Sequence, residues 1–146
     1  PISLTGIFVQ DLLLPVNVSN LHWIIAAVGI DHGSVHEKQV LIATIDSFNE
    51  ERAEVVQILE GWLLREAAKA NIRARLERRR VVSPRQSNNW DCGVCTLVAI
   101  EAMARNPEGA VEVVRRGGSM ESWYATRDVE ELRARLFREA MLEVHK

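Results

Sequence analysis

The stretch LHWIIAAVGIDHGSVHEKQVLIATID, from Leu21 to Asp46, contains two apolar runs on either side of a short polar segment. Leu21 to Ile30 is almost continuously apolar, which is typical of a buried strand. Gln39 to Asp46 has the length and the branched residue content of a second strand. The residues Asp31-His32-Gly33-Ser34 between them have turn chemistry. Because the connection is short, the two strands are predicted to pair antiparallel.

Further strands and a helix are expected on both sides of this hairpin. Residues 7–18 carry branched apolar types together with Pro15, which suits an edge strand or a strand end better than a central strand. Asn49, followed by two glutamates, predicts a helix start, and apolar residues at helical spacing continue this helix to about residue 70. Residues 72–83 alternate between apolar and charged types, which favours another strand.

The C-terminal half of the chain is predicted to be helical. Cys92 to Arg105 fits a buried helix with Asp91 at its N-cap and Asn106-Pro107 as its stop. A short helix is expected over 110–114, and a last amphipathic helix is expected to start at Asp128 with a capping box. Strands followed by helices in this order predict the α+β class.

Length and composition indicate one packed domain over residues 1–146. The 146 residues are 47% apolar and 26% charged, and a net charge of −2 gives no indication of a nucleic acid or an anionic membrane as partner. The longest apolar run, Trp23 to Ile30, is far shorter than the ~20 residues of a membrane helix. The arginines between Arg73 and Arg80 could contact a nucleic acid or an acidic protein surface, but a solvated face is the favoured interpretation. An intracellular protein of the nucleus or cytoplasm is expected, and the start at Pro1 suggests a fragment of a longer chain.

The two cysteines of the chain, Cys92 and Cys95, allow four interpretations. They form a C-x-x-C motif at a predicted helix start, as redox pairs do. They could form half of a zinc site with His32 and His36, although no metal is expected because these histidines lie in a turn. Both could be small core residues. Finally, one of them could be a nucleophile.

The nucleophile interpretation gains weight from the polar residues elsewhere in the chain. Cys92 is the first residue of its predicted helix, where the helix dipole favours a thiolate. In an antiparallel hairpin, His22 and Asp46 fall at the same end, so the carboxylate can accept from the imidazole and fix its tautomer. A base, a group that orients it and a thiol are the components that nucleophilic catalysis needs.

At this point the sequence resembles a known family, the ubiquitin-like-modifier (SUMO) proteases, which are cysteine peptidases related to the adenoviral protease. The resemblance is carried, in chain order, by Leu14-Pro15-Val16-Asn17 leading to His22-Trp23, by Asp46-Ser47, and by Gln86-x-Asn88-x-x-Asp91-Cys92-Gly93. It extends over roughly residues 11–145. It implies a papain-like or adenoviral-protease-like α+β fold, with a small, mostly antiparallel sheet flanked by helices.

The resemblance also implies a role for each matching residue. His22 would be the catalytic base, Asp46 the residue that orients it, Gln86 an oxyanion donor and Cys92 the nucleophile. The residues expected to bind substrate are Trp23, Asn88, Trp90 and Gly93, although a core position is favoured for Trp23 over a substrate contact. No cofactor is expected. The implied activity is cleavage after the Gly-Gly-type tail of a SUMO-like modifier, and the implied partners are this modifier and its conjugates.

The chain departs from the family's pattern in two places. Family domains carry a substantial portion ahead of the strand that contains Pro15, and this chain has about ten residues there, so a second chain completing the domain is a candidate partner. Cys95 lies closer to the nucleophile than the family's usual second cysteine. Three alternative functions stay open: an acetyltransferase effector with a similar His, acid and Cys order, a non-catalytic modifier-binding module, and a viral maturation protease.

Overall fold

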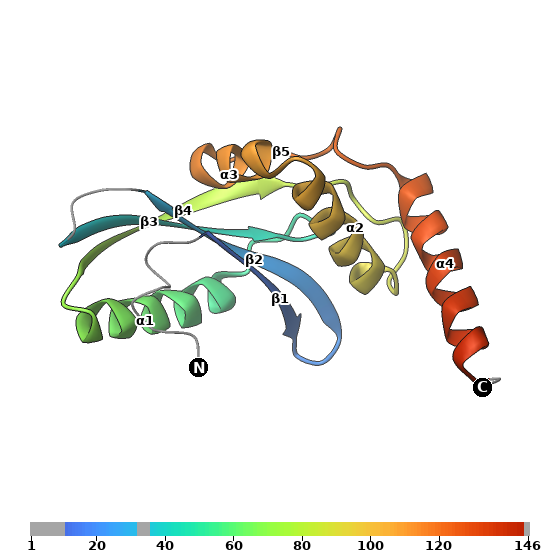
Figure 1. Ribbon diagram of the computed structural model, residues 1–146, viewed down its shortest axis with the longest axis horizontal. Helices are drawn as coiled ribbons and strands as arrows, with labels where there is room; N and C mark the ends of the chain where they lie inside the picture. Colours follow the sequence, from blue (N-terminus) through green and yellow to red (C-terminus); the bar gives the residue numbers. More distant parts are fainter. Residues whose placement is uncertain (1–10, 32–35, 145–146) are drawn as a thin grey trace.

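A five-stranded sheet with helices on both faces forms the body of the computed structural model, which describes residues 11–31 and 36–144 (Figure 1). The strands lie in the order β1-β2-β3-β4-β5. Along the chain the elements are β1 (Leu12–Val18), β2 (His22–Asp31), β3 (Glu37–Ile45), α1 (Ala53–Lys69), β4 (Arg73–Val82), α2 (Cys92–Arg105), α3 (Pro107–Arg116), β5 (Gly118–Ser119) and α4 (Thr126–Val144). The predicted α+β class is confirmed.

The pairing of the strands follows from the connections between them. β1, β2 and β3 pair antiparallel, as the hairpin prediction requires, and Ile25 lies opposite Ile45 in the register of β2 and β3. β4 pairs parallel with β3, and β5 pairs parallel with β4. The sheet is therefore evenly mixed, which differs from the mostly antiparallel sheet expected from the sequence. The reason is that α1 carries the chain back along the sheet before β4 begins.

The described part of the first predicted strand lies at the edge of the sheet. β1 pairs with β2, and no other strand of the described residues flanks it. Pro15 lies in the middle of β1, where an edge strand tolerates the missing N–H. Of the two positions inferred from Pro15, the sheet edge is confirmed and the strand end is wrong. Residues 7–10 of that prediction lie outside the described residues.

The predicted start of the first helix at Asn49 is wrong. α1 begins at Ala53, and Asn49 has a positive φ of 58° in the loop that precedes the helix. The Asn49 side chain donates to the carbonyl of Ser83 and accepts from its backbone N–H, both at 2.9 Å. Asn49 therefore ties the loop after β3 to the end of β4 instead of capping a helix.

The predictions for the later helices are mostly confirmed. α2 begins at Cys92 with Asp91 in the N-cap position, although the Asp91 carboxylate makes no capping hydrogen bond. Asn106 ends α2 and caps α3, because its side chain accepts from the N–H of Gly109 at 3.1 Å. The helix expected over 110–114 is the middle of the longer α3.

The start of the last helix differs from its prediction by two residues. α4 begins at Thr126, and the carboxylate of Asp128 accepts from the backbone N–H of Ala125 at 2.6 Å. This is the backward hydrogen bond that the third helical residue makes in a capping box. Asp128 thus belongs to the first turn of α4 and is not its cap.

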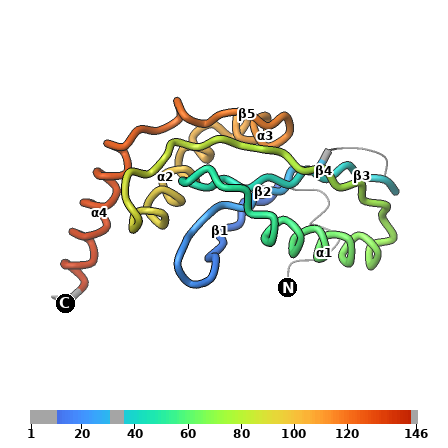
Figure 2. The backbone as a smooth tube through the Cα atoms, turned by 180° about the vertical axis from the view of Figure 1, so that it is seen from behind, coloured from blue at the N-terminus to red at the C-terminus, as the bar shows by residue number. Residues whose placement is uncertain are grey.

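Two apolar clusters hold the sheet between its helices. Alternate residues of β2 enter the two clusters, with Ile24 packed on the α1 side and Ile25 on the side of α2 and α3. Burial on both faces explains the almost continuous apolar run in this strand. Figures 1 and 2 show α1 on one side of the sheet and α3 on the other, with α4 beside α2. The first residue of β2, His22, is therefore held by a strand that is buried from Ile24 to Ile30.

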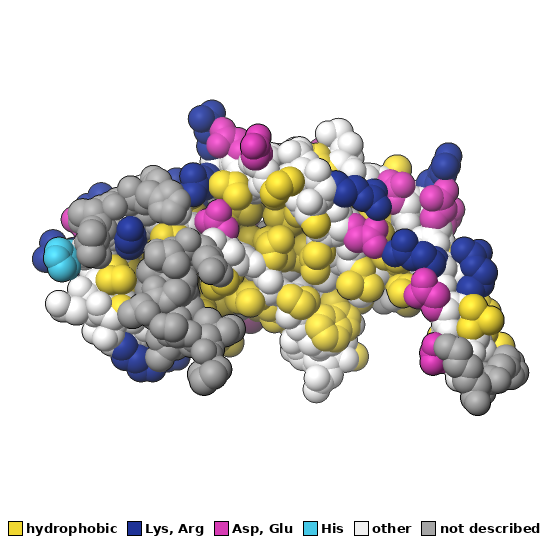
Figure 3. Space-filling view, in the orientation of Figure 1, with side chains coloured by type: hydrophobic (Ala, Val, Ile, Leu, Met, Phe, Trp, Pro, Cys, Tyr) yellow, Lys and Arg dark blue, Asp and Glu magenta, His cyan; other side chains and the backbone are white. Residues whose placement is uncertain are grey.

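Apolar side chains also reach the surface beside β1. Figure 3 shows hydrophobic side chains gathered on the middle of the face that Figure 1 presents. An apolar groove lies between β1 and the helices α2 and α3, and its lining includes Leu12, Leu13, Met103 and Val114. None of the residues predicted to be catalytic lines this groove. Within residues 11–31 and 36–144, no helix has the length and apolar character of a membrane span.

Candidate active site

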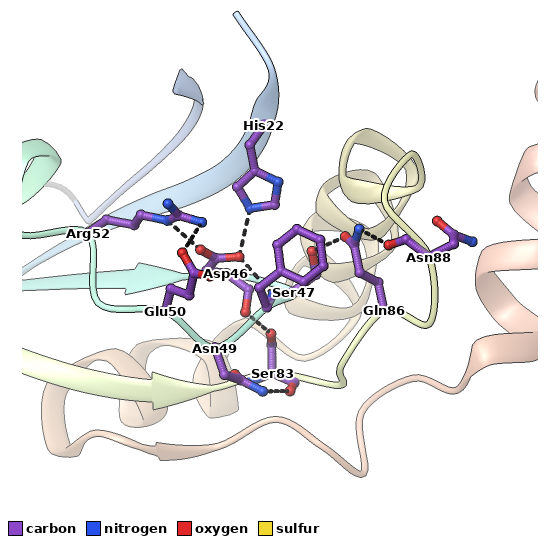
Figure 4. Close-up of polar contacts among 10 residues, drawn as sticks. His22, Asp46, Ser47, Asn49, Glu50, Arg52, Ser83, Gln86 and Asn88 are labelled. Atoms are coloured by element: carbon purple, nitrogen blue, oxygen red, sulfur yellow. Dashed lines mark hydrogen bonds and ion pairs between the residues drawn. The ribbon is translucent and has the colours of Figure 1, made fainter. Parts of the chain in front are cut away.

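The end of the β2–β3 hairpin brings His22 and Asp46 together. His22 is the first residue of β2, and Asp46 directly follows the last residue of β3. Because the two strands are antiparallel, these positions meet at one end of the sheet. His22 Nε2 lies 2.7 Å from Asp46 Oδ1, and both side chains are buried (Figure 4). The proximity predicted from the hairpin is confirmed.

Three donors hold the Asp46 carboxylate in place. Its Oδ1 also accepts from the backbone N–H of Phe48 at 2.8 Å, and its Oδ2 accepts from the guanidinium of Arg52. Only 1% of Asp46 is exposed. A carboxylate can only accept, so a neutral His22 imidazole would carry its proton on Nε2 and leave the lone pair of Nδ1 free. This tautomer is the one a general base needs.

Two further residues support the imidazole, and sequence reasoning missed both of them. The Phe48 ring stacks on the His22 ring, with centroids 5.0 Å apart and an angle of 23° between the planes. Arg52 forms an ion pair with Asp46 and another with Glu50. Phe48 follows Asp46-Ser47 directly, but no spacing rule in the sequence connects it with a histidine 26 positions earlier.

Gln86 is held beside this pair by Ser47. The backbone N–H of Gln86 donates to the Ser47 carbonyl at 2.9 Å, and the Ser47 hydroxyl donates to Gln86 Oε1. One N–H of the Gln86 amide donates to the carbonyl of Asn88 (Figure 4). These bonds fix the amide with its oxygen toward Ser47, which leaves its second N–H as a donor for a substrate oxygen.

The loop from Gln86 to Asp91 is braced by Asn88. Asn88 Oδ1 accepts from the backbone N–H groups of Trp90 at 3.1 Å and Asp91 at 2.9 Å. Its Nδ2 donates to Asp91 Oδ2 at 2.7 Å. The side chain of Asn88 is thus engaged within the loop, and the substrate-binding role expected for it stays a prediction.

Cys92 opens α2 next to this loop. It is 6% exposed, and the first helical hydrogen bond runs from the N–H of Cys95 to the carbonyl of Asp91 at 2.8 Å. The N-terminus of a helix favours negative charge, which suits a thiolate. No direct hydrogen bond joins Cys92 to His22 in the part of the chain that the structure describes. Catalytic hydrogen bonds are often long before substrate binds.

Trp23, which follows His22, lies close to Gly93, which follows Cys92. A Cβ atom placed on Gly93 would lie 3.5 Å from Cδ1 of Trp23. The start of α2 therefore lies close to the start of β2, where the candidate base is found. Trp23 is 41% exposed, so the core position favoured for it from the sequence is wrong. Trp90 is 74% exposed.

The second cysteine is held as a neutral thiol. Cys95 is buried and free, and burial, followed by the Asp91 carboxylate, raises its pKa to about 11. Of the two histidines in the zinc alternative, His32 lies outside the described residues. Among the residues that are described, no group of three or more His, Cys, Asp or Glu side chains could hold a metal ion.

The arrangement fits the chemistry of one class of protein. A cysteine at a helix N-terminus, an imidazole oriented by a buried carboxylate and a side-chain amide six residues before the cysteine are the groups that a cysteine protease needs, and the roles expected for them stay a prediction. The model of the Ulp1 protease family, C-terminal catalytic domain, matches residues 9–142. The chain belongs to the Ulp1 protease family, which confirms the resemblance inferred from the sequence.

One solved structure shares the fold at low sequence identity, and a second has a weaker similarity. A crystal structure of the de-sumoylating protease is similar with a TM-score of 0.57 and 23% identity, over 73% of this chain and 42% of that chain. SUMO protease Ulp1 with its catalytic cysteine oxidised to a sulfenic acid has a TM-score of 0.49 and 20% identity, over 84% and 48% of the two chains. The match thus spans less than half of the length of either protein. No curated protein matches this chain.

Proposed function

We propose that this chain is a cysteine peptidase or isopeptidase that cleaves after the Gly-Gly-type tail of a SUMO-like modifier through an acyl-enzyme on Cys92. The observation that carries the proposal is the buried hydrogen bond of 2.7 Å between His22 and Asp46 in a domain of the Ulp1 family. A buried, carboxylate-oriented imidazole is costly to build and serves proton transfer directly.

The first half of the reaction forms the acyl-enzyme. His22 Nδ1 takes the proton of the Cys92 thiol, and the sulfur attacks the carbonyl carbon of the last glycine. The oxyanion accepts from the second N–H of Gln86 and from the backbone N–H of Cys92. The imidazolium, stabilised by Asp46, then gives its proton to the leaving amine, and the C–N bond breaks to leave a thioester.

The second half releases the modifier. A water molecule loses a proton to His22 and attacks the thioester, the same two donors hold the second oxyanion, and Cys92 leaves and recovers its proton. Each oxyanion donor contributes about 3 kcal/mol to such a transition state. No step of this cycle requires a cofactor.

The surroundings of Cys92 favour a substrate tail without side chains. Trp23 lies against Gly93, and Trp90 is exposed close to the cysteine in sequence. A glycine next to the nucleophile admits a substrate backbone, and the exposed indoles offer apolar surface to a tail of small residues. The intracellular setting expected from the sequence, in the nucleus or cytoplasm, belongs to the same proposal, as does a second chain that completes the modifier-binding surface.

The proposal is tested by incubating the purified chain with a SUMO precursor and with a SUMO conjugate, next to a Cys92→Ala variant. Cleavage after the second glycine, found by mass spectrometry and absent in the variant, is expected. Turnover of acetyl-CoA without proteolysis would favour the acetyltransferase alternative. Tight binding of SUMO without cleavage would indicate a binding module, and either of these results would overturn the proposal.

A further inference from the structure

The last helix reaches the candidate active site through an arginine. α4 lies beside α2 at one end of the molecule (Figures 1 and 2). Arg133 of α4 donates through Nη2 to Oδ2 of Asp91, the residue before Cys92. The Arg133 side chain is 47% exposed, whereas the Asp91 side chain is 6% exposed. A half-exposed arginine therefore holds a buried carboxylate next to the candidate nucleophile.

Asp91 also forms hydrogen bonds with the loop that contains the candidate oxyanion donor, Gln86. Asp91 Oδ2 also accepts from Asn88 Nδ2, and the Asp91 backbone N–H donates to Asn88 Oδ1. The Asn88 carbonyl in turn accepts from the amide of Gln86. An unbroken series of hydrogen bonds thus runs from Arg133 to Gln86, over 47 positions of sequence.

The same contact has an electrostatic side. The buried charge of Asp91 lies directly before Cys92 and opposes a thiolate there, and the guanidinium of Arg133 offsets that charge. Both charges affect the pKa of a thiol in the first turn of α2, that of Cys95. The pKa of Cys95 is raised mainly by burial and then by Asp91, while Arg133 acts in the opposite direction.

We propose that Arg133 is a positioning residue of the active site, which aligns Gln86 and Cys92 for the reaction by holding Asp91. The inference rests on the proposed function in that Cys92 is the nucleophile. Arg133 touches neither the thiol nor the imidazole among the contacts of the described residues, so it acts through Asp91. Its loss is expected to slow the chemical step more than it weakens binding.

Arg135 provides a matched control. It lies two residues further along α4, is 50% exposed, and forms an ion pair with Glu101 of α2 at 2.7 Å. Both arginines therefore join the same two helices, but Glu101 lies near the other end of α2, away from Cys92. If Arg133 only docked α4, Arg135→Ala would have a comparable effect.

The test compares Arg133→Ala with Arg135→Ala in two assays. In SUMO cleavage, Arg133→Ala should lower kcat by about 10- to 100-fold with KM within about twofold, since small misplacements of reacting groups cost this much. In alkylation by iodoacetamide at pH 7, in a Cys95→Ala background, Arg133→Ala should slow labelling of Cys92 several-fold. Arg135→Ala should change both rates by less than about twofold. Equal effects of the two variants, or no effect of Arg133→Ala, would overturn the proposal.

Two further variants separate positioning from loss of structure. Arg133→Lys keeps the charge and should recover a large part of the labelling rate. In an Asp91→Asn background, Arg133→Ala should have little further effect on labelling, because the charge to be offset is gone. Full additivity of the two changes, in variants that still unfold cooperatively, would contradict the proposal. The labelling assay needs no substrate, so it tests Arg133 even if SUMO is not cleaved.

Discussion

Replacing Asp46 by asparagine alters the hydrogen bonding at His22 with almost no change in side-chain size. In the native site, Oδ1 accepts from His22 Nε2 and from the Phe48 N–H, and Oδ2 accepts from Arg52. An asparagine side chain has one oxygen, so it cannot accept from both His22 and Arg52. With the oxygen toward Arg52, the amide N–H group faces His22 and forces the proton onto Nδ1. With the oxygen toward His22, the amide N–H group points at the Arg52 guanidinium.

Both orientations impair the proposed reaction. In the first, Nδ1 carries a proton and cannot accept one from Cys92, and in the second, the negative charge that stabilises the imidazolium is missing. Loss of the correct tautomer costs about 10⁴-fold in kcat in a protease with the same logic, which corresponds to roughly 5 kcal/mol. The lost hydrogen bond to a charged group lowers the free energy of unfolding by about 2 kcal/mol. A domain of ordinary stability remains folded after such a loss.

The assay is steady-state cleavage of a fluorogenic SUMO substrate, with thermal unfolding measured on the same samples. Asp11→Asn is the matched control, because the Asp11 carboxylate accepts from the backbone N–H of Ile30 at 2.9 Å, near the other end of β2. Asp46→Asn should lower kcat by about 10³- to 10⁴-fold, and Asp11→Asn should leave kcat unchanged. A loss of less than tenfold in folded Asp46→Asn would refute the role assigned to this carboxylate.

Three other predictions follow from the contacts described above. Gln86→Ala should lower kcat by about 10²- to 10³-fold with little change in KM, and a loss of less than threefold would exclude it as an oxyanion donor. In Cys92→Ala, alkylation of Cys95 should be slow at neutral pH and speed up only as the pH approaches about 11. The reason is that burial raises the pKa of the Cys95 thiol and keeps its reactive thiolate scarce. Fast labelling near pH 8 would contradict the burial of Cys95. Leu63 is 0% exposed, so Leu63→Ala should lower the free energy of unfolding by about 2–5 kcal/mol in denaturant titrations. Leu64 is 49% exposed, so Leu64→Ala should change the free energy of unfolding little. Equal effects of the two variants would argue against the packing of α1.

Local sequence patterns were sufficient for the elements that carry the site. The apolar run of β2 and the strand pattern of β3, joined by a short turn, predicted the hairpin that brings His22 to Asp46. The polar loop ahead of Cys92 predicted the start of α2. These features depend on residues near each other in the chain, so their pattern is visible without knowledge of the fold.

Contacts between distant residues were not predictable in the same way. Asn49 has the sequence signature of a helix cap, yet it binds Ser83, which lies 34 positions further along the chain. The ion pair between Arg133 and Asp91 spans 42 positions, and no local pattern indicates it. The parallel pairing of β3 with β4 depends on where α1 packs, which the strand patterns alone do not specify.

The residues around the imidazole show the same limit. Asp46-Ser47 was recognised as a motif, and Asp46 was placed next to His22. The hydrogen bond from Ser47 to Gln86 and the stacking of Phe48 on His22 became visible only when the end of β3 and the loop before α2 were placed together. Sequence reasoning proposed the reacting groups, which stay a prediction, and missed most of the residues that hold their side chains in place.

The most informative single measurement uses a SUMO protein whose C-terminal carboxylate is replaced by a thiol-reactive electrophile. The chain and its Cys92→Ala variant are each mixed with this reagent, and the mass of the protein is recorded. A single SUMO adduct on the native chain that is absent from Cys92→Ala is the expected result, because it requires both a reactive Cys92 and a bound modifier tail. An adduct that persists in Cys92→Ala, or the absence of an adduct from a folded native chain, would contradict the assignment of Cys92 as the nucleophile of a SUMO-directed protease.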